Sequence, residues 1–167
     1  MSGQRKSLGC ARDLQRRFTA CPESARRRPI TRTLTRAKAV PHLRQSRGNV
    51  VTVASISGIQ GQPYNAAYCA SKGGLILLMK SLAVELAADG IRVNCVCPGG
   101  VDTPLSAGAV APILVSVDLS FTNRMVGVLP GGFSAPSEIA EAIAYLASDA
   151  AASITGASLV IDRGTLW

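Results

Sequence analysis

The alternation of apolar and polar positions changes at about Gly48. Ahead of this residue no apolar period is sustained until about Leu34, whereas beyond it short apolar runs alternate with longer stretches of helix-forming residues. Three short apolar runs predict strands, at 49–54, 91–97 and 159–161. Glycine, serine or proline bounds the first two of them, as expected for buried strands that end in loops.

Two longer stretches predict helices. Residues 66–88 end at Gly90 and carry a repeat of apolar positions typical of an amphipathic helix, at Leu75, Leu78, Leu82 and Leu86. Pro136 opens a second helix that runs to about Ser148, with acidic residues at 138 and 141 near its positive end. The order strand, helix, strand, helix, strand predicts an α/β fold with a parallel sheet and helices on its faces.

Charge is distributed unevenly along the 167 residues. Residues 1–47 hold 13 basic and 2 acidic side chains, whereas residues 48–167 hold 5 and 8, so the formal charge of +8 comes from the first segment. Because a sustained apolar period begins only at about Leu34, we expect two parts, a disordered basic leader at 1–33 and one folded domain at 34–167. The leader is open to three interpretations: a transit peptide, a basic arm, or residues with no function of their own. Apart from Phe18 no aromatic residue lies among its arginines, so we do not expect nucleic acid as a partner.

The numbers and spacing of cysteine and histidine argue against several kinds of site. The five cysteines form an odd set without C-x-x-C spacing, which argues against a disulfide framework and against a zinc site. Reduced thiols indicate a cytoplasmic location. His42 is the single histidine, so a Ser-His-Asp triad would have to use it. No apolar run approaches the roughly 18 residues that span a bilayer, and we expect no membrane association.

Tyr68 and Lys72 are the most informative pair for chemistry, because residues four apart on a helix share one face. An isolated phenol gives up its proton only near pH 10, but an adjacent ammonium stabilises the phenolate. Such a pair can donate or accept a proton without a histidine. A Tyr-x-x-x-Lys spacing also occurs by accident on exposed helix faces, so the pair alone is weak evidence.

Neighbouring strand ends strengthen that interpretation. Ser55 follows the first predicted strand, and the glycine-containing turn 98–103 follows the second. Open α/β sheets bind their ligands at the carboxyl ends of their strands, where these groups would converge. Glycines at 99 and 100 allow close backbone approach, and Thr103 offers a hydroxyl.

From about Leu34 to Gly164 the chain resembles the C-terminal part of a short-chain dehydrogenase/reductase, close to the 3-oxoacyl-carrier-protein-reductase-like members. The segments that carry the resemblance occur in the family's order, at 48–51, 54–58, 68–72, 90–94, 97–104, 136–140, 146–149 and 154–156. The resemblance implies a partial Rossmann-type, doubly wound parallel sheet that contains only the C-terminal strands and helices.

The resemblance also implies an activity, NAD(P)-dependent hydride transfer between nicotinamide and a carbonyl or alcohol, as in an alcohol dehydrogenase or ketoreductase. Ser55 would bind the substrate oxygen, Tyr68 would exchange its proton, and Lys72 would stabilise Tyr68 and hold the nicotinamide ribose. The cofactor-binding residues carried over in the same way are Tyr68, Lys72, Pro98, Gly99, Val101 and Thr103. The expected partners are a small carbonyl or alcohol substrate, NAD or NADP, and a second copy bound through the 66–88 helix.

Two departures from the family accompany this resemblance. Residues 1–47 contain only Gly3 and Gly9, neither in a glycine-rich turn of the form T-G-x-x-x-G-x-G, so the pyrophosphate cradle is missing from this chain. We expect impaired cofactor binding and activity, and an exposed edge on the 49–54 strand that favours aggregation. Near the C-terminus the chain has Asp-Arg-Gly at 162–164, where the family usually has Asp-Gly-Gly.

The sequence also allows two other hypotheses. In the first, the chain is a catalytically inactive fragment that acts as an interaction module, through the strand edge or the long helix. Alternatively, it would be a binding protein whose basic residues 1–47 carry the function.

Overall fold

The computed structural model describes residues 31–104, 106 and 127–166 of the chain. The chain divides into two units, Met1–Pro41 and His42–Trp167, and helix α2 (Thr31–Ser46) runs across their boundary. The expected leader at 1–33 lies outside the described residues except for its last three, with which α2 begins. The second unit holds the sheet and is the subject of the sections below.

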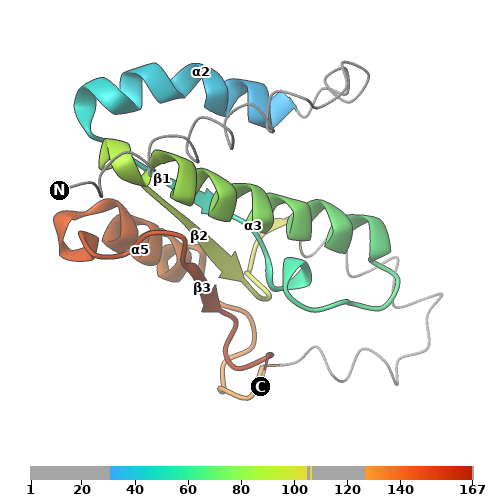
Figure 1. Ribbon diagram of the computed structural model, residues 1–167. Helices are drawn as coiled ribbons and strands as arrows, with labels where there is room; N and C mark the ends of the chain where they lie inside the picture. The colour runs from blue at the N-terminus through green and yellow to red at the C-terminus, as the bar shows by residue number, and fades with distance from the viewer. Residues whose placement is uncertain (1–30, 105, 107–126, 167) are drawn as a thin grey trace, which may run out of the picture. The chain divides into compact units, whose positions relative to one another are not determined.

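Three parallel strands form the sheet, in the order β1 (Asn49–Val53), β2 (Arg92–Pro98) and β3 (Ser158–Ile161). Asn49 pairs with Arg92 at the start of β1, and Cys95 pairs with Ser158 at the start of β3. The predicted strands and their parallel arrangement are confirmed, with ends that differ by one residue. The sheet with its helices (Figure 1) is the α/β, Rossmann-type architecture that the resemblance implied.

Central position in the sheet explains the composition of β2. All its residues from Val93 to Pro98 are buried, because neighbouring strands cover both edges and helices cover both faces. A strand enclosed in this way reads as a continuous apolar run rather than an alternation.

Helix α3 (Ala66–Leu86) covers one face of the sheet, where the Thr52 hydroxyl lies 3.1 Å from the Met79 sulfur. The helix continues into a 3₁₀ turn, η3 (Ala87–Asp89), and stops at Gly90, whose φ of 71° a glycine adopts without strain. Its position is as predicted, but the buried set differs from the expected leucine repeat: Leu75, Ile76, Met79, Ala83 and Leu86. Leu78 and Leu82 are only half-buried. Apolar residues occur nearly all round this helix, so spacing alone did not select the buried face.

The opposite face of the sheet is covered by α5 (Pro136–Ala147). The buried cluster on this side contains Val96 from β2, Ile139 and Leu146 from α5, and Ala151 from the short turn η5 (Asp149–Ala151). At the C-terminal end of α5 the Arg92 guanidinium donates to the carbonyls of Leu146 and Ser148, at 2.7 and 3.0 Å. These bonds satisfy carbonyls that the last turn of a helix leaves without partners.

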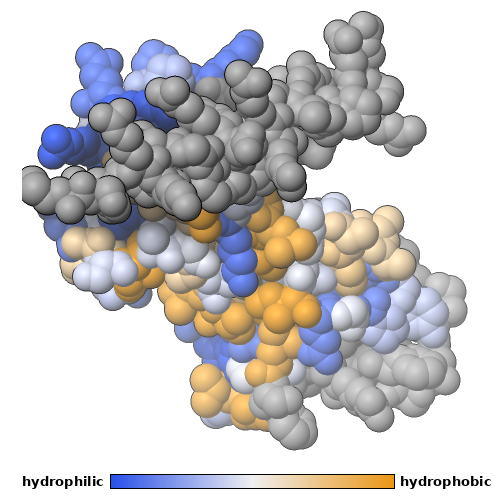
Figure 2. Space-filling model, viewed as in Figure 1, coloured by the Kyte–Doolittle hydropathy of each residue, from blue (hydrophilic) through white to orange (hydrophobic). Residues whose placement is uncertain are grey.

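Residues Ala66–Asp89 are long and apolar enough, by length and composition alone, to cross a membrane. This finding differs from the expectation that no run reaches that length. Helix α3 packs against β2. A helix in the core of a sheet fold can have the same length and apolar composition as a helix that crosses a membrane. Part of α3 is nevertheless apolar at the surface (Figure 2), with Leu77 and Val84 exposed by 69% and 79%. These two residues lie seven apart, and therefore on the same side of the helix.

Candidate active site

Ser55 follows the carboxyl end of β1 and caps the short 3₁₀ turn η2 (Ile56–Gly58). Its hydroxyl oxygen accepts a hydrogen bond from the Ser57 backbone N–H at 3.2 Å. Serine is favoured at such a cap because its oxygen satisfies an otherwise unpaired amide. The Ser57 hydroxyl in turn donates to the Gln62 side chain at 2.6 Å. Ser55 is therefore buried in a loop that local hydrogen bonds hold in one conformation.

Lys72 lies beside this loop. From the second turn of α3 its ammonium donates to the carbonyls of Ala54 and Val53, at 2.9 and 3.3 Å. Both carbonyls belong to the end of β1, directly before Ser55. An ammonium has three N–H donors, so these two bonds leave one for another acceptor.

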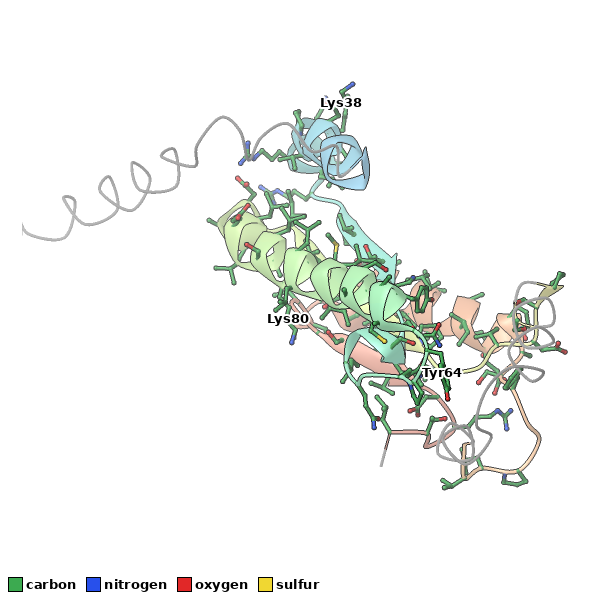
Figure 3. All side chains as sticks on the ribbon, turned by 90° about the vertical axis from the view of Figure 1, so that its right-hand side faces the viewer. Lys38, Tyr64 and Lys80 are labelled. Carbon is green, nitrogen blue, oxygen red and sulfur yellow. The ribbon has the colours of Figure 1, made fainter. Side chains whose placement is uncertain are left out.

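Tyr68 lies one turn before Lys72 on α3, as the four-residue spacing predicted. The Lys72 nitrogen lies 5.6 Å from the centre of the Tyr68 ring, within the range of a cation–π contact. Tyr68 is 47% exposed, so solvent or a ligand can reach it. Another tyrosine, Tyr64, lies in the turn before α3 (Figure 3) and is more exposed, at 58%.

Gly58 explains how the Ser55 loop comes so close to the helix. A Cβ atom at this position would lie 2.7 Å from the carbonyl carbon of Lys72 and 2.8 Å from the side chain of Ile76. Only a residue without a side chain allows the loop backbone to lie against the helix here. Sequence reasoning placed Gly58 in a loop but gave no sign of this contact.

Cys97 connects the ends of β1 and β2. Burial raises the pKa of its thiol, while a hydrogen bond from the Ser55 backbone and the charges of Lys72 and Lys80 act in the opposite direction. The thiol is therefore neutral near pH 7. Nothing in the sequence pattern distinguished Cys97 from the other cysteines.

Beyond β2 the chain turns through Gly99, which lies against β3. The Gly99 N–H donates to Ile161 at 2.9 Å, and a Cβ atom on this glycine would lie 2.8 Å from the Asp162 side chain. Pro98, at the end of β2, is buried. Both residues shape the turn as the resemblance implied, although no described contact assigns them to a ligand.

Val101 and Thr103 belong to a small network that also includes Ser106. The Ser106 hydroxyl lies 2.7 Å from the carbonyl of Val101, and it accepts a hydrogen bond from the Thr103 N–H at 3.1 Å. Val101 also forms an isolated parallel bridge with Ser134. Sequence reasoning missed both serines, which hold the backbone of this turn in place.

Lys72 thus contacts both the Tyr68 ring and the two carbonyls that precede Ser55 at the end of β1. Most of the segment between Thr103 and Gly127 lies outside the described residues.

The sequence of this chain is similar to those of known proteins. Residues 30–165 match the family described as enoyl-(acyl carrier protein) reductase. A cis-4-hydroxycyclohexanecarboxylate dehydrogenase of Sinomonas cyclohexanicum is 46% identical over 117 residues, which is 70% of this chain and 44% of the relative. The 3-oxoacyl-(acyl-carrier-protein) reductase of Rickettsia felis is 37% identical over 131 residues, covering 77% of this chain and 51% of the relative.

Solved structures of dehydrogenases are also similar to this chain. A short-chain dehydrogenase from Mycobacterium paratuberculosis bound to NAD is similar with a TM-score of 0.70 and 30% identity, over 75% of this chain and 48% of that one. Carveol dehydrogenase from Mycobacterium avium in complex with NAD has a TM-score of 0.68 and 33% identity, over 76% and 50%. The chain spans about half the length of the curated relatives it matches.

Proposed function

This chain belongs to the short-chain dehydrogenase/reductase family, and from that membership we propose that it is an NAD(P)-dependent oxidoreductase acting on a small carbonyl or alcohol. The observation that carries the proposal is the position of the Lys72 ammonium, which contacts the Tyr68 ring and the two carbonyls before Ser55. The reaction is that of an alcohol dehydrogenase or ketoreductase.

Each of the three residues has a separate task in this proposal. Tyr68 donates a proton to the carbonyl oxygen in the reductive direction and accepts it in the oxidative direction. Lys72 places its positive charge beside the phenol ring, and its bonds to Val53 and Ala54 keep that charge in place. Ser55 contributes a hydroxyl at the strand end, where it orients the substrate oxygen.

The described residues fit the nicotinamide end of the cofactor. The third donor of Lys72 suits a ribose hydroxyl, and the backbone of Val101 with the hydroxyl of Thr103 suits a carboxamide. Tyr68, Pro98 and Gly99 would surround the same group. When bound, the cofactor supplies or accepts the hydride, and the protein orients the reactants.

We propose that this chain alone binds the cofactor weakly, because residues 1–47 contain no glycine-rich turn to hold the pyrophosphate. A second candidate function follows from β1, which pairs on one side only among the described residues. As a catalytically inactive fragment, the chain would act as an interaction module through this edge. A cytoplasmic location and a homo-oligomer through the Ala66–Ala88 helix remain part of the proposal, the latter supported by the exposed Leu77 and Val84.

The test is a chimera in which the glycine-rich half of a relative replaces the residues before Leu34. We expect it to reduce a small ketone or oxoacyl substrate with a nicotinamide cofactor. Tyr68→Phe should lower kcat by at least a hundredfold, because general acid–base catalysis contributes about 10²–10⁴ in rate. Tyr64→Phe, the matched control on a more exposed tyrosine, should leave the rate unchanged. A Tyr68→Phe chimera that kept more than about a tenth of the parent rate would contradict the assignment.

A further inference from the structure

Arg163 stands where the family usually has glycine, and its backbone has a left-handed φ of 54°. This region favours glycine, because in other residues Cβ crowds the backbone. A residue with a long side chain in this conformation needs contacts that hold it there.

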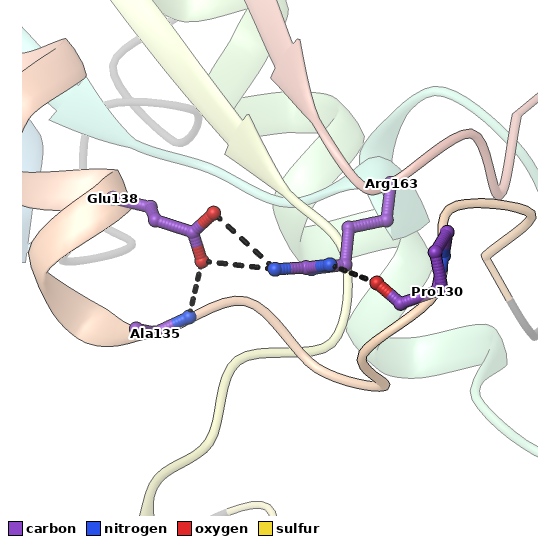
Figure 4. A network of polar contacts seen from close by, with 4 residues as sticks. All are labelled: Pro130, Ala135, Glu138 and Arg163. Atoms are coloured by element: carbon purple, nitrogen blue, oxygen red, sulfur yellow. Dashed lines mark hydrogen bonds and ion pairs between the residues drawn. The ribbon is translucent and has the colours of Figure 1, made fainter.

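Three such contacts join Arg163 to the segment before α5 and to α5 itself (Figure 4). The guanidinium donates to the Pro130 carbonyl at 2.7 Å through Nη1 and to the Glu138 carboxylate at 3.3 and 3.4 Å through Nη2. The Arg163 carbonyl accepts a hydrogen bond from the Leu129 N–H at 3.0 Å. Arg163 therefore links the end of β3, the 127–134 segment and the first turn of α5.

The surroundings of Arg163 accommodate the side chain closely. A Cβ atom at Gly127 would lie 2.8 Å from the Cβ of Arg163, and one at Gly131 would lie 3.1 Å from Nη1. Two glycines thus provide the space that the arginine occupies. The carboxylate of Glu138 also accepts a bond from the Ala135 N–H, and this amide, followed by Arg163, lowers the pKa of Glu138. The Glu138 carboxylate is therefore charged at neutral pH.

The same segment holds the turn that follows β2. The Ser134 N–H donates to the Gly100 carbonyl, and the Asp102 N–H donates to the Ser134 carbonyl, both at 2.9 Å. Within the described residues, these two bonds are the backbone hydrogen bonds that form the parallel bridge between Val101 and Ser134. Ser134 therefore holds the Val101 backbone from one side, while the Ser106 hydroxyl bonds the Val101 carbonyl at 2.7 Å.

We propose that Arg163 is a positioning residue for the 100–103 turn. It fixes the 127–134 segment against α5, and that segment in turn fixes the backbone around Val101. The consequence for cofactor binding rests on the proposed function, which assigns Val101 and Thr103 to the nicotinamide. The link between Arg163 and the turn does not depend on that function.

Hydrogen exchange of backbone amides in the full chain tests this proposal without any cofactor. Arg163→Met removes the guanidinium bonds and keeps the left-handed backbone strain, whereas Arg163→Gly removes both. In both variants we expect the Asp102 and Ser134 amides to exchange at least tenfold faster than in the parent. In Arg163→Gly the Val93 and Cys95 amides of β2 should keep their parent rates, because the loss is local.

Two further variants separate positioning from general stability. Arg92→Met removes the other guanidinium that binds α5, at the opposite end of the helix, and should leave the Asp102 and Ser134 amides unchanged. Arg163→Lys can bond to Pro130 or Glu138 but not to both as a fork, and should restore part of the protection. Parent rates at Asp102 and Ser134 in either Arg163→Met or Arg163→Gly would overturn the proposal. Equal acceleration of the β2 amides in Arg163→Gly would also overturn it, since the role would then be general. The Tyr68→Phe chimera tests the proposed function separately, so the two failures are distinguishable.

Discussion

Single glycines at contacts between segments set the geometry of the candidate site. At Gly58 the backbone of the Ser55 loop lies against the Lys72 carbonyl, and no side chain could be added without displacing one of them. Lys72 reaches the carbonyls of Val53 and Ala54 from this helix position. The distance between Ser55 and Lys72 therefore depends on the absence of one methyl group.

Gly58→Ala should destabilise the chain by about 1–3 kcal/mol, because the new methyl group overlaps helix backbone that cannot move independently. Gly74→Ala is the matched control on α3, where an added Cβ meets nothing within 4 Å. It should stabilise the chain by up to about 1 kcal/mol, since alanine is the better helix former. Urea unfolding of both variants measures the difference. Equal stability of the two would show that the close contact at Gly58 is not a constraint.

At the scale of elements, the most consequential feature is the side of β1 that no strand in the described part of the chain pairs with. The Ala54 N–H donates to Val96 of β2, so alternation along the strand directs the backbone groups of Val51 and Val53 to the opposite side, where the Val53 carbonyl accepts a bond from Lys72. The strand carries no charged residue that would discourage another strand from pairing there. Val53 is also 45% exposed. This edge is therefore the best-supported surface for the alternative function as an interaction module.

Val53→Lys should slow the concentration-dependent aggregation of the chain, because a charge on an edge strand opposes the addition of another strand. Val84→Lys is the control, since it places the same charge on the exposed side of α3. It should leave aggregation unchanged and lower the population of any dimer formed through the helix. Light scattering and sedimentation velocity follow the two processes. Slower aggregation with Val84→Lys but not with Val53→Lys would assign the association to α3 instead.

For the whole molecule, charge and core lie in different parts of the chain. Eight basic and two acidic side chains lie in residues 1–30, so this segment holds six of the eight net positive charges. The buried apolar residues that the structure describes all lie between Ala54 and Ala151. They belong to the unit His42–Trp167. Charge and folding stability should therefore be separable by deletion.

Deleting residues 1–30 should change the Tm of the remaining chain by less than about 2 °C, because a loss of only 1 kcal/mol shifts the Tm of a domain of this size by about 4 °C. The same deletion should lower the salt concentration needed to elute the chain from heparin, since six net positive charges are removed. Differential scanning calorimetry and heparin chromatography measure the two effects. A large fall in Tm would show that the basic residues contribute to the fold.

Local signals were sufficient for the elements and for one part of the site. The β-branched run at 49–53, the turn at Pro98 and the proline that opens α5 are properties of neighbouring residues, so they predicted where strands and helices lie. The Tyr68–Lys72 pair was also predictable, because helix periodicity alone places residues four apart together.

Tertiary packing decided what neighbouring residues could not. Which side of α3 is buried depends on the position of the sheet, since the helix is apolar nearly all round. The close contact of Gly58 with Lys72 joins the Ser55 loop to α3. Arg163 reaches Pro130 and Glu138 across separations of 33 and 25 residues. The sequence by itself therefore determined the elements and the Tyr68–Lys72 spacing, whereas only the folded chain determined these contacts, because they exist only after distant segments have packed together.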